Sequence, residues 1–181
     1  MCEPASLMLT ETQILWSKVS ESHEVIKAEN PMPEFFGGKR TFVLAEITPP
    51  DGDFTKPISE WKFRFDDGQN FDNFPAWATP EECERRARLW LPEWIESKII
   101  LPGQEVESVT DGRTIVASYG TIQSVEGGTI QYVEGGTIQY VYGGTIQIYR
   151  PGIIDPAILK SSNAVLIDRS GPVPVCYVGK S

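Results

Sequence analysis

Few side chains in this sequence have the types and spacing that catalysis requires. The only histidine, His23, lies in the segment SESHE between Glu21 and Glu24. An imidazole beside carboxylates could act as an acid–base catalyst, but these glutamates are neighbours in sequence only, and such catalysis needs positioned partners. No serine has the G-x-S-x-G surroundings of a hydrolase nucleophile. We therefore expect His23 to be a solvated loop residue and the protein to be non-enzymatic, with no catalytic residues.

A second polar cluster follows the aromatic segment WKFRF (61–65). Its oxygen-bearing side chains, which could suggest calcium, are Asp66, Asp67, Asn70 and Asp72. Their spacing does not match an EF-hand loop, so we expect a polar turn. The glycine pairs of the chain neither precede a helix nor end in Gly-Lys-Ser/Thr, as a phosphate-binding loop would. The sequence therefore predicts no metal site and no cofactor.

Two groups of residues could contact a ligand or a partner. Tyrosine offers a large contact area and a polar tip at low entropic cost, and clustered arginines bind anions. The candidates are Tyr132, Tyr140, Tyr142, Tyr149, Arg85, Arg86 and Arg88. Each group also has a purely structural interpretation. The tyrosines would pack between layers, and the arginines would form the solvent-facing side of a helix.

The composition argues against several classes of protein. The 181 residues carry 25 acidic and 16 basic side chains, a net charge of −9. Direct binding to nucleic acid is disfavoured because phosphate neutralisation needs clustered Lys and Arg. No segment has the roughly 18 consecutive apolar residues of a membrane span, and no signal peptide is visible. Cys2, Cys83 and Cys176 are spaced for neither a metal nor a disulfide framework, so a soluble protein of a reducing cytoplasm is expected.

Residues 1–100 are expected to form an α+β domain. The segments HEVIKAE (23–29) and TFVLAEIT (41–48) have strand-like composition, and WKFRF (61–65) alternates as a half-buried strand does.

The strongest helix prediction begins at Thr79, with Thr79 as N-cap, Pro80 at N1 and Glu82 as capping-box partner. Pro92 predicts a kink or a break. An apolar stripe follows on one face, made of Cys83, Ala87, Trp90 and Trp94. We expect this stripe to pack on the aromatic side of residues 61–65.

An eight-residue repeat dominates residues 101–150. Residues 125–148 read VEGGTIQY, VEGGTIQY and VYGGTIQI, and a decayed copy occupies 117–124. Glycine accepts positive φ, so the glycine pairs are natural corners between short strands. Because so short a repeat cannot bury a core alone, its units must stack. The repeat predicts a β-helix (β-solenoid), followed by a tail, 151–181, in which 164–168 and 172–178 form a hairpin.

Two ways of winding are open. A single chain with three strands per turn needs about 24 residues per turn, which gives fewer than two turns and leaves two raw ends. In an intertwined homotrimer, each chain supplies one strand per layer, so four octads make a tube of useful length. We favour the homotrimer.

Which side of the strands faces inward is also open. Alternation puts Thr129, Gln131 and Val133 on one side and Ile130 and Tyr132 on the other. We favour valine inward. The column Ile122, Ile130, Ile138 and Ile146 would then be covered by Ile153, Ile154, Ile158 and Leu159 of the tail.

Phased as Val-x-Gly, the octads resemble the triple-stranded β-helix of the cell-puncturing needles of tailed phages and of related secretion-system spikes. The matching motifs are Val125-Glu126-Gly127, Val133-Glu134-Gly135 and Val141-Tyr142-Gly143. The resemblance covers residues 117–148 and implies a trimeric tube with Val125, Val133 and Val141 at its core. The needles usually have more octads, and often Asn or Asp where this chain has Gly128, Gly136 and Gly144. The whole chain loosely resembles uncharacterised phage and prophage proteins.

These patterns predict a non-enzymatic, trimeric assembly or binding protein of phage or prophage type, located in the host cytoplasm or in the virion. A small-molecule or protein ligand would bind at the clefts between chains. One alternative is a soluble phage-encoded inhibitor of a host defence system, acting by small-molecule sequestration or as an acidic nucleic-acid mimic. Another alternative is ice binding by a ladder of Thr121, Thr129, Thr137 and Thr145.

Overall fold

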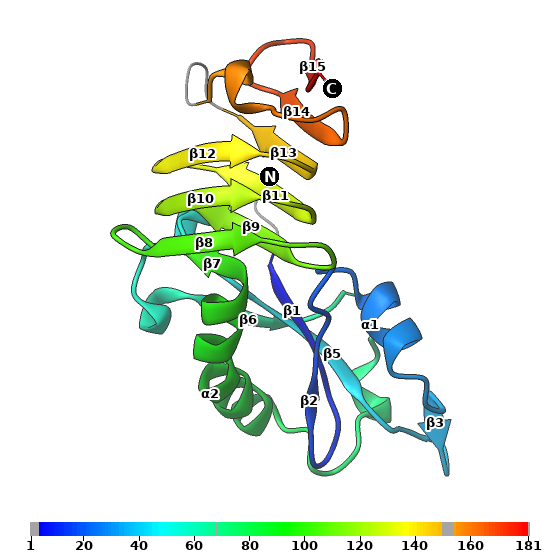
Figure 1. The fold of residues 1–181 in the computed structure, drawn as a ribbon. Helices are drawn as coiled ribbons and strands as arrows, with labels where there is room; N and C mark the ends of the chain where they lie inside the picture. The colour runs from blue at the N-terminus through cyan, green and yellow to red at the C-terminus, as the bar shows by residue number, and fades with distance from the viewer. Residues whose placement is uncertain (1–3, 68, 150–153, 181) are drawn as a thin grey trace. The chain divides into compact units, whose positions relative to one another are not determined.

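The computed structural model describes residues 4–67, 69–149 and 154–180. It divides the chain into two compact units, Met1–Trp94 and Ile95–Ser181 (Figure 1). The helix α2 (Pro80–Lys98) runs across the boundary. None of the helices in the described ranges is both long enough and apolar enough to cross a membrane.

The first unit is built on a four-stranded antiparallel sheet. Its strands, in spatial order, are β2 (Ile14–Leu15), β1 (Ala5–Leu9), β5 (Val43–Thr48) and β6 (Lys62–Phe65). The remaining elements are α1 (His23–Glu29), the hairpin β3 (Phe35–Phe36) and β4 (Lys39–Arg40), and the 3-10 helices η1 (Pro50–Gly52), η2 (Ile58–Glu60) and η3 (Phe71–Asn73). Every residue of β1, which lies between β2 and β5, is buried, so this strand lies in the core of the first unit. The predicted strands at 41–48 and 61–65 are confirmed as β5 and β6.

The segment 23–29, whose composition is strand-like, is instead the helix α1. Glu24 lies in its first turn, where the helix dipole favours an acid, and the Nζ atom of Lys27 pairs with its carboxylate at 2.6 Å. Ile26 is the one residue of α1 that is buried. A single buried residue with an i,i+3 ion pair suits a short surface helix better than a strand.

The predicted start of α2 is confirmed. The backbone N–H of Glu82 donates to Oγ1 of Thr79 at 3.2 Å, as the N-cap prediction requires. The predicted capping-box role of Glu82 is wrong, because its carboxylate accepts hydrogen bonds from Arg85 and the Thr79 N–H donates to the carbonyl of Trp77. Of the predicted kink or break at Pro92, the break is wrong, because the helix continues to Lys98, and the kink stays a prediction. Proline removes one backbone hydrogen bond, and the fully buried Leu91 and Trp94 on either side of it compensate for that loss.

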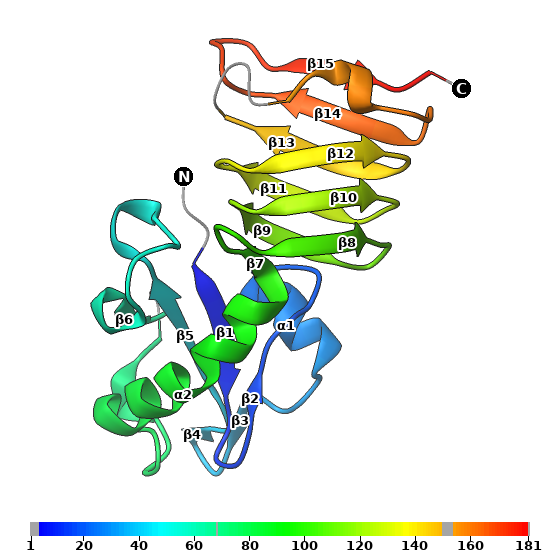
Figure 2. The same cartoon turned by 60° about the vertical axis from the view of Figure 1, so that its left-hand side comes forward.

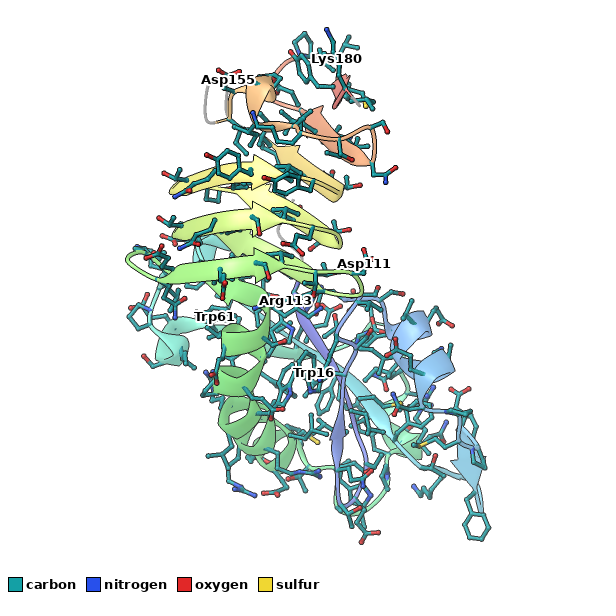
Figure 3. The ribbon with its side chains drawn as sticks, viewed as in Figure 1. Trp16, Trp61, Asp111, Arg113, Asp155 and Lys180 are labelled. Atoms are coloured by element: carbon teal, nitrogen blue, oxygen red, sulfur yellow. The ribbon has the colours of Figure 1, made fainter. Side chains whose placement is uncertain are left out.

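The apolar stripe of α2 is buried as predicted. The Trp94 ring meets the Trp61 ring edge-on at 6.4 Å between centroids, and it stacks on Phe54 at 6.2 Å. Of these three residues, Trp61 is labelled in Figure 3. Burying a large side chain stabilises a fold by roughly 1.5–3 kcal/mol, so this aromatic cluster is a main stabiliser of the first unit.

The second unit is a β-solenoid of about four turns (Figure 2). One parallel sheet contains β8 (Glu105–Val109), β10 (Thr121–Val125) and β12 (Thr137–Val141). The other sheet is parallel except for its last pair, β14 and β15. It contains β7 (Ile99–Ile100), β9 (Thr114–Ser118), β11 (Thr129–Val133), β13 (Gly144–Ile148), β14 (Ala164–Asp168) and β15 (Val175–Val178). From β7 to β13, successive strands alternate between the two sheets. In the fourth turn, the segment that contains η4 (Pro156–Ile158) takes the place of a strand. Its Leu159 forms an isolated parallel β-bridge with Val141.

The winding differs from both arrangements considered from the sequence. Thr121 pairs with Thr137 and Thr129 with Thr145, so one turn takes two octads of the same chain rather than three. The glycine corners reverse the chain, so two strands close a turn. The shortage of turns that favoured intertwined chains therefore disappears. The homotrimer itself stays a prediction.

Both candidate inward positions are buried in the solenoid. Ile130 and Val133 are within 2 % of complete burial, while Gln131 and Tyr132 between them are partly exposed. Strict alternation is thus broken once in each of β10, β11 and β12, which lets two apolar side chains per strand enter the core, whereas β13 alternates strictly, with Ile146 and Ile148 buried. The predicted trimer core, Val125, Val133 and Val141, is the solenoid's own core. Ile154 and Leu159 belong to the same cluster, and Ile153 lies outside the described residues.

The predicted glycine corners are confirmed, and glycine is needed there for two reasons. Gly128, Gly136 and Gly144 have φ of +73°, +74° and +83°. A Cβ atom on Gly136 would also lie 1.9 Å from the carbonyl oxygen of Gly120 in the turn below. Asparagine tolerates positive φ, but a side chain has no space there. These corner positions therefore require glycine.

The tail is part of the second unit. The predicted hairpin is confirmed, because β14 and β15 pair antiparallel, with Leu166 opposite Tyr177. β14 also extends the solenoid by pairing in parallel with β13.

The substitution Gly136→Ala should destabilise the solenoid more than Gly112→Ala does. Both glycines have φ of +74°, but a Cβ atom on Gly112 meets nothing within 4 Å. The shared backbone strain costs about 1–2 kcal/mol, and the clash at Gly136 should bring the total above about 3 kcal/mol. Scanning calorimetry of both variants measures the difference. Equal losses would show that the close approach at the corner does not matter.

Candidate functional site

The four candidate tyrosines fall on two different sheets, because consecutive octads alternate between them. Tyr140 on β12 and Tyr142 just after it have ring centroids 6.3 Å apart. Tyr132 on β11 stacks on Tyr149 at 4.9 Å with 27° between the ring planes. The structure therefore makes two tyrosine pairs rather than one ladder.

The pair Tyr140 and Tyr142 borders a hollow of about 300 Å³ on the outer face of the three-stranded sheet. Its lining is Glu107, Ser108, Gln123, Ser124, Glu126, Gln139, Tyr140 and Tyr142, which we call the tyrosine–glutamate face. The two tyrosines are 46 % and 49 % exposed, so a ligand could reach them.

Hydrogen bonds order part of the tyrosine–glutamate face. The hydroxyl of Ser124 lies 3.3 Å from both Oε1 of Glu126 and the carbonyl oxygen of Glu107, and it can donate to one of them at a time. The side-chain amide of Gln123 donates to Oε1 of the adjoining Glu105 at 2.7 Å. The bond from Gln123 holds the Glu105 carboxylate in place on a sheet whose backbone is fixed by parallel pairing.

The charge of this face is negative. Among the described residues that line it, the only charged side chains are Glu107 and Glu126, and Glu105 lies beside them. Lys160 lies at the edge, with Nζ 5.8 Å from the centroid of the Tyr140 ring. Carboxylates attract cations, and the faces of tyrosine rings do so as well. The arrangement suits a positively charged ligand.

The three candidate arginines are engaged within the first unit. The guanidinium of Arg86 donates to the carbonyl oxygens of Thr10 and Gln13 at 2.7 and 2.9 Å, and so holds the turn between β1 and β2. Arg88 donates to the carbonyls of Ile58 and Trp61, at 3.0 and 2.8 Å.

Arg85 is exposed and forms an ion pair with Glu82. The hydrogen bonds from Arg85 lower the pKa of the Glu82 carboxyl group. The arginines therefore have protein partners, two of them structural, and do not form a common anion site.

His23 is not the solvated loop residue that the sequence predicts. It is the first residue of α1, and its side chain is only 10 % exposed. Nδ1 lies 3.2 Å from Oδ2 of Asp66, and Nε2 lies 3.2 Å from the carbonyl oxygen of Ala45. Sequence reasoning missed this cluster because its members are far apart along the chain.

The remaining polar candidates have structural roles. Oδ1 of Asn70 accepts the backbone N–H of Asp72, which fits the predicted polar turn. Burial raises the pKa of the Cys83 thiol to about 11, so it stays protonated at neutral pH and is a poor nucleophile.

The threonines of the octads form two short ladders on opposite sheets. Thr121 lies beside Thr137, and Thr129 lies beside Thr145. An ice-binding surface needs a single flat array of such side chains. This division therefore gives ice binding little geometric support.

Comparison of the chain with protein-family models, with curated proteins and with solved structures finds no match. The interpretation of the site therefore rests on its geometry.

Replacing Arg86 with alanine should destabilise the first unit by about 2–3 kcal/mol, because two backbone carbonyls lose a charged donor. Arg85→Ala is the matched control on the same helix and should leave the denaturation midpoint unchanged, since exposed ion pairs contribute little. Urea denaturation followed by tryptophan fluorescence measures this, since all five tryptophans lie in the first unit. Equal midpoints for both variants would refute the structural role of Arg86.

Proposed function

We propose that this protein is a non-enzymatic binding protein that holds a positively charged partner protein on the tyrosine–glutamate face. The observation that carries the proposal is the hollow in which Glu107 and Glu126 lie with the exposed Tyr140 and Tyr142. Tyrosine side chains supply contact area, and the carboxylates select for lysine or arginine on the partner.

The construction of the solenoid supports this role. Strands stacked in parallel on a buried core make a rigid platform, and contact residues held by such a platform lose little entropy on binding. The platform repeats from turn to turn, which suits an extended segment of the partner rather than a compact small molecule.

The kind of biological task comes from the octad resemblance alone. It favours an assembly or binding module of phage or prophage type, in the host cytoplasm or in a virion. A soluble inhibitor of a host defence system is the second candidate. The negative charge of the face favours it, because enzymes that bind nucleic acids present basic surfaces to which an acidic mimic could bind.

Binding of a lysine- and arginine-rich peptide should depend on this face. Titration calorimetry at low salt should detect binding that weakens as salt is added. The double variants Glu107→Gln/Glu126→Gln and Tyr140→Ala/Tyr142→Ala should each bind at least about tenfold more weakly, a loss of about 1.4 kcal/mol. Tyr149→Ala, an exposed tyrosine on the other sheet, is the control and should bind as the unaltered chain does. If all variants bind alike, the face is not the binding site.

The homotrimer is a separate prediction that follows from the resemblance. It predicts a species of roughly three times the 20.2 kDa chain mass in sedimentation at micromolar concentration. A 20.2 kDa species would exclude the trimer and leave the binding face intact, because every strand of that face comes from one chain.

A further inference from the structure

The first unit brings together three side chains of the types that bind transition metals. His23 begins α1, Glu46 lies on β5, and Asp66 directly follows β6. One ligand atom of each lies within 4.8 Å of the others. The side chains of His23 and Glu46 are only 10 % and 12 % exposed, and that of Asp66 is 34 % exposed, so the cluster is largely shielded from water.

The backbone hydrogen bonds of the sheet fix this cluster. Ala45, whose carbonyl contacts the imidazole, precedes Glu46 on β5. Asp66 is tied to the same strand, since its backbone N–H donates to the carbonyl of Leu44 at 3.0 Å. The three ligand positions are therefore set by two paired strands and the first turn of a helix.

The hydrogen-bond partners of His23 show that an additional positive charge is needed between it and Asp66. The carbonyl oxygen of Ala45 can only accept, so Nε2 must carry the hydrogen. In neutral imidazole, Nδ1 then presents its lone pair to the Asp66 carboxylate 3.2 Å away, where two acceptors repel. A proton or a metal cation at Nδ1 removes this conflict.

The same contacts match the usual surroundings of a metal-bound histidine. Such a histidine generally donates its other N–H to a backbone carbonyl or a carboxylate, which fixes the ring and its tautomer. Nε2 of His23 does this with Ala45. Nδ1 is left pointing at one carboxylate with a second close by, as a cation site requires.

The neighbouring charges leave room for a cation. Glu46 uses Oε2 for both hydrogen bonds from Arg64, at 2.8 and 2.5 Å, so its other oxygen, Oε1, is the one that could turn to a metal. Arg64 is 60 % exposed, so water screens its charge. The hydrogen bond and the charge of Glu46 raise the pKa of Arg64 most, and the charges of Asp67 and Asp66 raise it further. Asp67 is therefore a third carboxylate near the cluster.

We propose that His23 Nδ1, Asp66 and Glu46 bind one divalent transition-metal ion. One nitrogen and two carboxylate oxygens suit Zn²⁺, which takes three protein ligands and a water in open sites. The ion would tie the start of α1 to β5 and β6. The proposal is independent of the tyrosine–glutamate face, which lies in the other unit.

The test uses the full chain after removal of metals with a chelator. Titration calorimetry with ZnCl₂ should give one site, and Zn²⁺ should raise the melting temperature of the first unit by roughly 5 °C or more when in large excess over its Kd. Tryptophan fluorescence follows that unit alone. Co²⁺ as a spectroscopic probe should show the visible absorption of nitrogen and oxygen ligation without a thiolate charge-transfer band.

His23→Gln and Asp66→Asn should each weaken Zn²⁺ binding at least about tenfold and clearly reduce the melting shift at the same Zn²⁺ concentration. Asp67→Asn, the adjacent carboxylate outside the cluster, is the matched control and should keep both. Far-UV circular dichroism establishes that each variant is folded, and two ligand variants guard against the failure of one.

Three results would overturn the proposal. The unaltered chain could fail to bind Zn²⁺, which would make the contact an imidazolium–carboxylate pair. His23→Gln and Asp66→Asn could bind as tightly as the unaltered chain. A thiolate band with Co²⁺ would place the ion on cysteine instead.

Discussion

The close stacking of glycine corners is the constraint on which the second unit depends. At Gly128, Gly136 and Gly144 the chain turns at positive φ, and the backbone of the preceding turn lies too close to leave space for a side chain. Gly128 and Gly144 stack in this way, and so do Gly120 and Gly136. A side chain at such a corner would separate the turns and break the parallel hydrogen bonds between them. The regular glycine spacing thus sets the rise of the solenoid and the register of its strands.

The distribution of side chains follows from that winding. With two octads per turn, consecutive octads lie on opposite sheets. A residue therefore stacks on its equivalent two octads away, and not on its equivalent in the next octad. The core receives both the isoleucine and the valine of each octad, because two successive residues between them face outward in β10, β11 and β12. The polar and aromatic residues are left outside in two separate sets. One set, with Tyr140 and Tyr142, lies among carboxylates, and the other, with Tyr132 and Tyr149, stacks ring on ring.

In the first unit, polar groups are positioned by hydrogen bonds between residues that are far apart in the sequence. Arg86 on α2 reaches the carbonyls of the β1–β2 turn, and Arg88 on the same helix holds the segment around Ile58 and Trp61. His23 enters a polar cluster because the start of α1 lies against β5. In each case, a side chain that looks exposed in the sequence has a partner many residues away. The sheet brings these groups together, and the buried Trp94 and Trp61 keep helix and strand in contact.

The sequence by itself determined the β-solenoid, the glycine corners, the strands at 41–48 and 61–65, the capped start of α2 and the C-terminal hairpin. These features depend on residue type and short-range spacing, such as a glycine pair every eight residues or a threonine before a proline. Only the tertiary structure decided the number of strands per turn, the helix at 23–29, the continuity through Pro92 and the meeting of His23, Glu46 and Asp66. Each of these depends on free energies of packing between segments distant in sequence. Periodicity shows which residues are equivalent, but it does not show which of them become neighbours.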